Sequence, residues 1–197
     1  MPKGISLTDE ELARRRGEIC AAAMHLFVEK GFLETSMREI AEAAGVGKST
    51  LYDYFPSKDE ILIAYVVEEV RHMTDRAEEV ITQELSVTEK FRRILRKHLE
   101  YLLANKLLSL KLGYEAQRLS MESMQRIQVH RYAYQDMLCD LVQEGIQNGE
   151  FRPVNPLLAV HGMMALVAPT VYTSRPTGSP EEMLEEAIDL LFKGMQA

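Results

Sequence analysis

The stretch GVGKST, residues 45–50, has the residue types that bind phosphate. In a P-loop, backbone N–H groups surround the phosphates of a nucleotide and a lysine reaches them. The full signature needs a glycine five residues before the Gly-Lys pair, and Glu42 stands at that position. A P-loop also follows a buried strand, whereas Ile40, Ala43 and Ala44 have helical spacing. We therefore do not predict nucleotide binding for this stretch.

No other cluster of reactive residues predicts catalysis. Histidines stand at positions 25, 72, 98, 130 and 161, and no two of them have the spacing of metal ligands. No serine–histidine–acid or cysteine–histidine arrangement is recognisable. We predict no catalytic residue, no metal site, no cofactor and no enzymatic activity.

The bulk properties favour a globular protein of the cytoplasm. The chain has 197 residues, of which 46% are hydrophobic, enough for one good core or two small domains. Two cysteines far apart suit a reducing compartment, and no export leader precedes the first helical segment. The apolar stretch at 156–172 is near the length of a membrane span. It contains His161 and Pro169 and lacks aromatic belts, so we expect a buried helix and no membrane partner.

The net charge of −7 argues against indiscriminate binding to nucleic acid. It still allows a specific DNA reader, because only the face that meets phosphate has to be positive. Residues 1–60 carry eight Lys or Arg against eleven Asp or Glu, so any positive surface is local.

The pattern of caps and apolar residues predicts an all-α fold of about nine helices. Ser/Thr-x-x-Glu start signals recur at Thr8, Ser36, Ser57, Ser86 and Ser179, and Asn155-Pro156 makes a sixth start. Glycines that can close helices in the left-handed conformation stand at Gly31, Gly45 and Gly149. We expect an N-terminal three-helix domain at 1–56 and a larger helical bundle at 57–197, with the fourth helix as the connection.

A helix-turn-helix is the clearest motif within the first domain. We expect a capped helix from Met37 to Ala44, a turn at 45–47, and a second helix from Lys48 to about Phe55. Two short helices joined in this way place the second one in the DNA major groove. Val46 would fill the corner between them.

The exposed side of this motif suits DNA. On a helical projection Ser49 and Asp53 point away from the core, with Thr50 and Tyr52 beside them, so these four are expected to read base edges. Phosphate contacts would fix the register. They are expected from the motif's ends, at Ser36, Arg38, Lys48, Tyr54 and Lys58.

Residues 32–62 resemble the DNA-binding domain of the tetracycline-repressor (TetR) family of bacterial regulators, above all in GVGKSTLYDYFPSKDEIL. The resemblance extends over about residues 10–62. A second, weaker similarity to the family lies in GEFRP at 149–153. It implies a three-helix DNA-binding domain, a variable ligand-binding bundle and a homodimer formed by the last two helices. It also implies DNA contacts, which fall on Ser36, Lys48, Ser49, Thr50, Tyr52, Tyr54 and Lys58. Asp53 departs from the neutral or basic residues often found at its position.

The larger domain has methionine and tyrosine side chains interleaved with polar ones. Methionine adapts to irregular apolar ligands, and tyrosine adds a polar tip to an apolar wall. The methionine and tyrosine side chains of the larger domain therefore suggest a pocket for a small, largely apolar effector. The alternative is that they belong to ordinary core packing. The residues considered are His98, Tyr101, Tyr114, Gln117, Met121, Met124, His130, Tyr134 and Met137.

These features together predict a homodimeric repressor that an effector releases from double-stranded operator DNA. The dimer helices are expected at about 156–173 and 180–195, where small residues recur at three-residue steps from Ala159 to Ala168. A two-fold dimer would read half-sites roughly 34–36 Å apart in a near-palindromic operator. Three alternatives stay open, namely an activator, a small-molecule-binding protein or enzyme on the same scaffold, and a nonspecific, architectural DNA protein.

Overall fold

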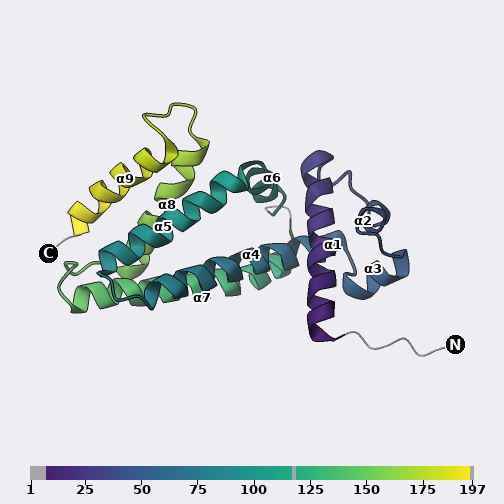
Figure 1. Ribbon diagram of the computed structural model, residues 1–197, viewed down its shortest axis with the longest axis horizontal. Coiled ribbons are helices and arrows are strands. Elements are labelled where there is room, and N and C mark those ends of the chain that lie inside the picture. The colour runs from purple at the N-terminus through teal and green to yellow at the C-terminus, as the bar shows by residue number, and fades with distance from the viewer. Residues whose placement is uncertain (1–7, 117–118, 196–197) are drawn as a thin grey trace. The chain divides into compact units, whose positions relative to one another are not determined.

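The computed structural model describes residues 8–116 and 119–195, and within these ranges the fold is all-α, with nine helices and no strand (Figure 1). The helices are α1 (Asp9–Glu29), α2 (Met37–Ala43), α3 (Lys48–Tyr54), α4 (Lys58–Ile81), α5 (Val87–Ala104), α6 (Lys106–Ala116), α7 (Met121–Gln147), α8 (Pro156–Tyr172) and α9 (Pro180–Met195). The all-α prediction is confirmed.

The helices for which the sequence shows a cap begin next to it, at α1, α2, α4, α5, α8 and α9. Thr8 and Ser36 form complete capping boxes with Glu11 and Glu39, so both ends of each box satisfy backbone N–H groups. Side chains also cap the first turns of α5, α8 and α9, from Ser86, Asn155 and Ser179. The turn glycines have the positive φ that favours this residue, at Gly31 (100°), Gly45 (64°) and Gly149 (80°).

The chain divides into two compact units. The first holds the residues up to Glu68 together with Leu107–Arg126, and the second holds Glu69–Lys106 and the residues from Ile127 onward. The first turns of α4 and nearly all of α6 therefore pack with the helices of the helix-turn-helix. The functional boundary at 56/57 stays a prediction.

The core of the first unit is built from α1 to α4, and α6 adds Leu112 and the half-buried Leu108. Its centre holds fully buried side chains such as Phe27, Ile40, Leu51 and Phe55. Leu112 of α6 is buried in the same cluster, although it lies far along the chain. Helix α6 therefore helps to stabilise the unit that carries the helix-turn-helix.

The core of the second unit packs α5, α8 and α9 against one another (Figure 1). The rings of Phe151 and Phe192 stack with their centroids 5.7 Å apart, and Phe91 lies beside them. Helix α8 is not buried all round, because Leu158 is 72% exposed. Among the helices of the described ranges, none is long and apolar enough to cross a membrane.

Candidate functional site

The α2–turn–α3 segment has the geometry of a helix-turn-helix. Gly45 takes the left-handed conformation and donates its N–H to the carbonyl of Glu42 at 3.2 Å. The Val46 N–H then bonds the carbonyl of Ala41 at 3.0 Å, and the half-buried Val46 side chain packs on the core. Leu51, which is fully buried, anchors α3 in that core. The predicted motif is present, one residue shorter at the end of each helix.

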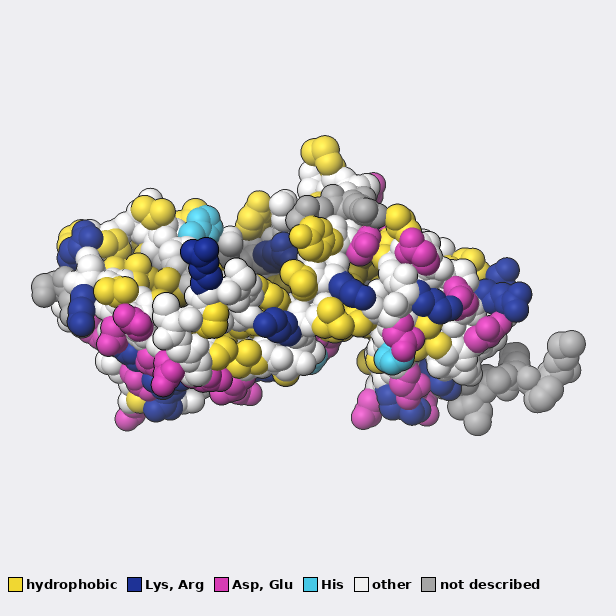
Figure 2. Space-filling view, turned by 90° about the horizontal axis from the view of Figure 1, so that it is seen from above, with side chains coloured by type: hydrophobic (Ala, Val, Ile, Leu, Met, Phe, Trp, Pro, Cys, Tyr) yellow, Lys and Arg dark blue, Asp and Glu magenta, His cyan; other side chains and the backbone are white. Residues whose placement is uncertain are grey.

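One side of α3 faces solvent, and it presents side chains that the sequence predicted as DNA contacts. Lys48, Ser49, Thr50 and Asp53 are exposed, and Tyr52 is 45% exposed. Tyr54 is half-buried and packs against the core of the first unit. On the face shown in Figure 2, Lys/Arg and Asp/Glu side chains are interspersed over the N-terminal part of the described chain, at the right.

Arg16 of α1 contacts the C-terminal end of α3. Its guanidinium donates to the carbonyl of Tyr54 at 2.9 Å and lies 4.3 Å from the centre of the Phe55 ring. The neighbouring Arg14 and Arg15 instead pair with Glu18 on the surface of α1, at 3.1 and 3.0 Å. The basic run in α1 therefore has two roles, and one of them fixes the C-terminal end of α3.

Lys58 lies at the start of α4, and its ammonium group is occupied within the first unit. It donates to the carbonyls of Phe32, Leu33 and Thr35 at 2.6, 3.0 and 3.1 Å. It also lies 4.7 Å from the centre of the Phe32 ring. An ammonium has three N–H donors, so these carbonyls use all of them. The sequence did not predict this role, because it depends on a loop 23 or more residues away.

The start of α2 has two of the predicted phosphate contacts. Ser36 accepts from the N–H of Glu39 and donates to its carboxylate at 2.8 Å, while Arg38 pairs with Glu42 at 2.9 Å. Lys30 donates to Glu39 and, with the Ser36 bonds, lowers the pKa of that carboxyl to about 2. The cap of α2 therefore remains intact throughout the physiological pH range. Both Ser36 and Arg38 remain exposed.

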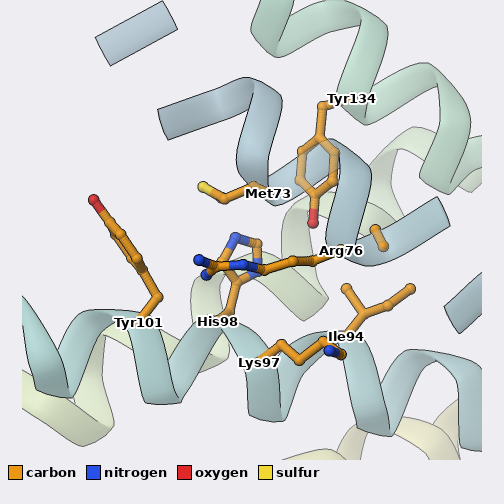
Figure 3. Close-up of a pocket in the computed structure, with 8 residues that line it drawn as sticks. Met73, Arg76, Ile94, Lys97, His98, Tyr101 and Tyr134 are labelled. Carbon is orange, nitrogen blue, oxygen red and sulfur yellow. The ribbon is translucent and has the colours of Figure 1, made fainter. Parts of the chain in front are cut away.

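A small cavity lies in the second unit between α4, α5 and α7 (Figure 3). Its volume of about 10 Å³ holds roughly one water molecule. The lining combines apolar side chains with two cations, an imidazole and two phenols. The lining residues are Met73, Arg76, Ala77, Ile94, Lys97, His98, Tyr101 and Tyr134.

His98 is the most unusual of these residues. It is 7% exposed, and neither ring nitrogen has a hydrogen-bond partner. Its ring meets that of Tyr134 edge-on, with 5.9 Å between centroids. Burial, with a smaller contribution from Arg76, lowers the pKa of His98 from 6.5 to about 4, so the imidazole is neutral at physiological pH. Burial likewise raises the pKa of the Tyr134 phenol, which keeps its proton.

The cavity brings together only part of the predicted effector set. His98, Tyr101 and Tyr134 line it, as expected for pocket residues. Five others lie elsewhere: Tyr114, Met121 and His130 are exposed, whereas Met124 and Met137 are half-buried outside the lining. Gln117 lies outside the described residues. The effector role of these six stays a prediction, and no contact at this cavity supports it.

Sequence reasoning missed five residues of the lining, namely Met73, Arg76, Ala77, Ile94 and Lys97. A signal existed, since Met73–Ala77 and Ile94–His98 are pairs four residues apart, and each pair shares a helix face. The four-residue spacing along one helix does not show which helix faces pack against each other. Within the described ranges, no group of three His, Cys, Asp or Glu side chains is placed to hold a metal ion.

An apolar groove of about 350 Å³ runs between α8 and α9 on the surface of the second unit. Its lining includes Ala165, Leu166 and Pro169 of α8 and Met183 and Leu190 of α9. Leu190 is 69% exposed. An exposed apolar surface of this kind is typical of a protein interface.

Comparison with known proteins identifies the family. Residues 19–65 match the family described as bacterial regulatory proteins, tetR family, and residues 84–195 match the tetracyclin repressor-like, C-terminal domain. The chain is 30% identical over 135 residues to the fatty acid metabolism regulator protein of Bacillus subtilis (strain 168), covering 68% of this chain and 70% of that protein.

Solved structures agree with this assignment. The regulator FadR of Bacillus subtilis in complex with stearoyl-CoA superposes with a TM-score of 0.79 at 27% identity, covering 90% of this chain and 98% of that one. Thermus thermophilus FadR, a TetR-family repressor in complex with lauroyl-CoA, gives 0.65 at 25% identity and covers 92% and 95%. The chain belongs to the TetR family of bacterial transcriptional regulators, and it is a DNA-binding regulator, not an enzyme.

Proposed function

We propose that the protein is a homodimeric repressor that binds a near-palindromic operator in the cytoplasm and leaves it when an acyl-CoA binds. The proposal of DNA binding rests on the exposed face of α3. Arg16 fixes the C-terminal end of this helix through the carbonyl of Tyr54. We assign DNA binding to residues 1–56, and effector binding and dimerisation to 57–197. The proposed DNA contacts are Ser36, Arg38, Lys48, Ser49, Thr50, Tyr52 and Tyr54. Lys58 is left out because its donors are used by backbone carbonyls.

The groove between α8 and α9 supports the homodimer. Its apolar lining continues along α8 in side chains that face solvent, among them Leu158, Ala165 and Ala168. Such a stripe needs a partner, and a second copy of the same chain supplies one in a two-fold arrangement. Small residues on the stripe let two helices approach closely. A two-fold dimer would then place its two α3 helices on half-sites roughly one DNA turn apart.

The proposed effector class is supported by two similar regulators whose solved structures contain stearoyl-CoA and lauroyl-CoA. The cavity at His98 is the proposed entry point of the effector into the bundle. Its volume of about 10 Å³ is far below that of an acyl chain. Binding therefore has to separate α4, α5 and α7.

Helix α4 is the proposed link between effector and DNA. It runs unbroken from Lys58 to Ile81, so one helix contains both Lys58, which holds the Phe32–Thr35 loop, and Arg76 at the cavity. A shift of α4 on effector binding would therefore move the anchor of that loop. The coupling requires that the effector bind the two conformations with different affinities, because equal affinity shifts nothing.

The deciding experiment has two stages. Selection from random double-stranded DNA with the purified protein should enrich a near-palindrome, bound far more tightly than random sequence at the same salt concentration. Butyryl-, lauroyl- and stearoyl-CoA are then added to the complex, with CoA alone as the control. Release by at least one thioester, and none by CoA, is expected. Weak binding without an enriched motif would overturn the DNA assignment, and a complex that no thioester releases would overturn the effector class.

A further inference from the structure

We propose that the cavity at His98 binds the carbonyl oxygen of the effector's acyl group, with a ring N–H of His98 as its hydrogen-bond donor. The inference rests on the proposed function, because it takes an acyl compound as the effector. It adds which atom of that compound is recognised, and by which side chain.

The ring of His98 has unused hydrogen-bonding capacity. Buried polar groups in proteins are almost always hydrogen-bonded. Both nitrogens of this ring lack a partner, although the side chain is almost fully buried. Its contact with Tyr134 is edge-on between rings and is not a hydrogen bond. The ring borders the cavity, so a group entering there meets an unused N–H.

The groups next to His98 are hydrogen-bond donors without a negative charge. Figure 3 shows the Tyr134 hydroxyl and the Arg76 guanidinium directed toward the space beside His98. Arg76 has only N–H donors and a permanent positive charge, and the phenol of Tyr134 remains protonated. None of the lining side chains is a carboxylate. The surroundings therefore favour an oxygen acceptor and disfavour an ammonium group or a metal cation.

Part of the cavity lining is apolar. Met73, Ala77 and Ile94 form a wall that offers no hydrogen bond. A phosphate would need more than one cation in place of such a wall. Lys97 is the other cation, and it lies 3.9 Å from the carboxylate of Glu79, which offsets its charge. An oxygen acceptor attached to an alkyl chain matches both the hydrogen-bond donors near His98 and the apolar wall. A thioester and a carboxylic acid each contain such an acceptor.

The test compares thioesters with analogues that lack only the carbonyl oxygen. Lauroyl-CoA is paired with S-dodecyl-CoA, and butyryl-CoA with S-butyl-CoA, in titration calorimetry of the full-length protein. Free laurate, added in parallel, distinguishes a carboxylic acid from a thioester as the source of the carbonyl. Removing the acceptor of one good hydrogen bond is expected to weaken binding by roughly 10- to 100-fold.

Two variants connect that preference to His98. His98→Phe keeps a ring of similar size next to Tyr134 but has no donor, and His25→Phe makes the same change at an exposed position of α1. We expect His98→Phe to reduce the preference for the carbonyl compound to about threefold or less, and His25→Phe to retain it. Melting curves confirm that both variants fold.

The outcomes separate this inference from the proposed function. If the wild-type protein binds neither a thioester nor laurate, the acyl effector class is wrong and this inference is wrong with it. If the wild-type protein binds an acyl compound, but His98→Phe still prefers the carbonyl form as strongly, then only the role of His98 is wrong. Loss of the preference in His98→Phe alone supports the inference.

Discussion

The ammonium nitrogen of Lys58 lies 2.6 Å from the carbonyl oxygen of Phe32 and 4.7 Å from the centre of the ring of the same residue. Lys58 stands at the first position of α4, and Phe32 lies in the loop that leads to α2. The lysine thereby joins the helix that starts the bundle to the segment that precedes the helix-turn-helix. Its position makes it a structural residue of the first unit.

Replacing Lys58 by methionine is expected to destabilise the first unit. The three carbonyls lose a charged donor, and hydrogen bonds to charged groups contribute about 1.5–3 kcal/mol. Partial exposure reduces this, so we expect a loss of about 1–2 kcal/mol, measured by urea unfolding. The salt dependence of operator binding should stay the same at a temperature where both proteins are folded. A shallower salt dependence would instead make Lys58 a phosphate contact.

Lys48→Gln should show the opposite behaviour. The side chain is exposed at the start of α3, so its removal should leave the melting temperature unchanged. If it binds phosphate, the logarithm of operator affinity should fall less steeply with the logarithm of salt concentration, by about one unit of slope. Arg14→Gln, which removes a charge that pairs with Glu18, serves as the control. An unchanged slope would remove Lys48 from the contact set.

Gly145→Ala is expected to destabilise the second unit. Alanine in a helix usually stabilises relative to glycine by about 0.5–1 kcal/mol. At this position, however, the added Cβ would lie 2.5 Å from Cδ2 of Phe151, whose ring is fully buried. We expect a net loss of about 1–3 kcal/mol. Gly17→Ala in α1, where nothing lies within 4 Å of the Cβ, should be stabilising. Equal melting shifts in both variants would contradict the packing argument.

Acid should destabilise the protein through His98. The unfolded chain protonates this imidazole near its ordinary pKa of 6.5, whereas the folded protein keeps it neutral down to about 4. The unfolded state therefore takes up the proton first, so stability falls as pH falls from about 6.5 to 4 and this contribution then levels off. The difference amounts to about 3 kcal/mol. His98→Phe should lose less stability over this range, measured by urea unfolding at several pH values. Parallel curves for the two proteins would refute this.

Charges placed on the apolar surface of α8 and α9, at Leu190 in the groove and at Leu158 farther along α8, should dissociate the proposed dimer. Leu158→Glu with Leu190→Glu puts four carboxylates into a two-fold interface, where burying unpaired charge is strongly unfavourable. Sedimentation velocity should show a dimer for the wild type and a folded monomer for the variant, with weaker operator binding. Leu107→Glu changes a similarly exposed leucine of the first unit and should remain dimeric. A dimeric double variant would place the interface elsewhere.

Local features of the sequence predicted much of the fold. Capping side chains at Thr8 and Ser36 and turn glycines such as Gly45 act on backbone groups within four residues, so their effect can be seen without knowing the rest of the chain. The helix-turn-helix follows from the same short-range signals. The buried Leu51 and the exposed Lys48 on α3 likewise agree with the helical periodicity.

The sequence by itself thus determined the all-α class, the starts of the capped helices, the helix-turn-helix and the exposed side chains of α3. Only the tertiary structure decided how Lys58 is used, that Leu112 of α6 packs with the first unit, and that Arg76 and His98 share a cavity. The reason is physical. Caps and periodicity depend on neighbours a few residues apart, whereas these three features depend on which helix faces meet, and that depends on the packing of the whole core.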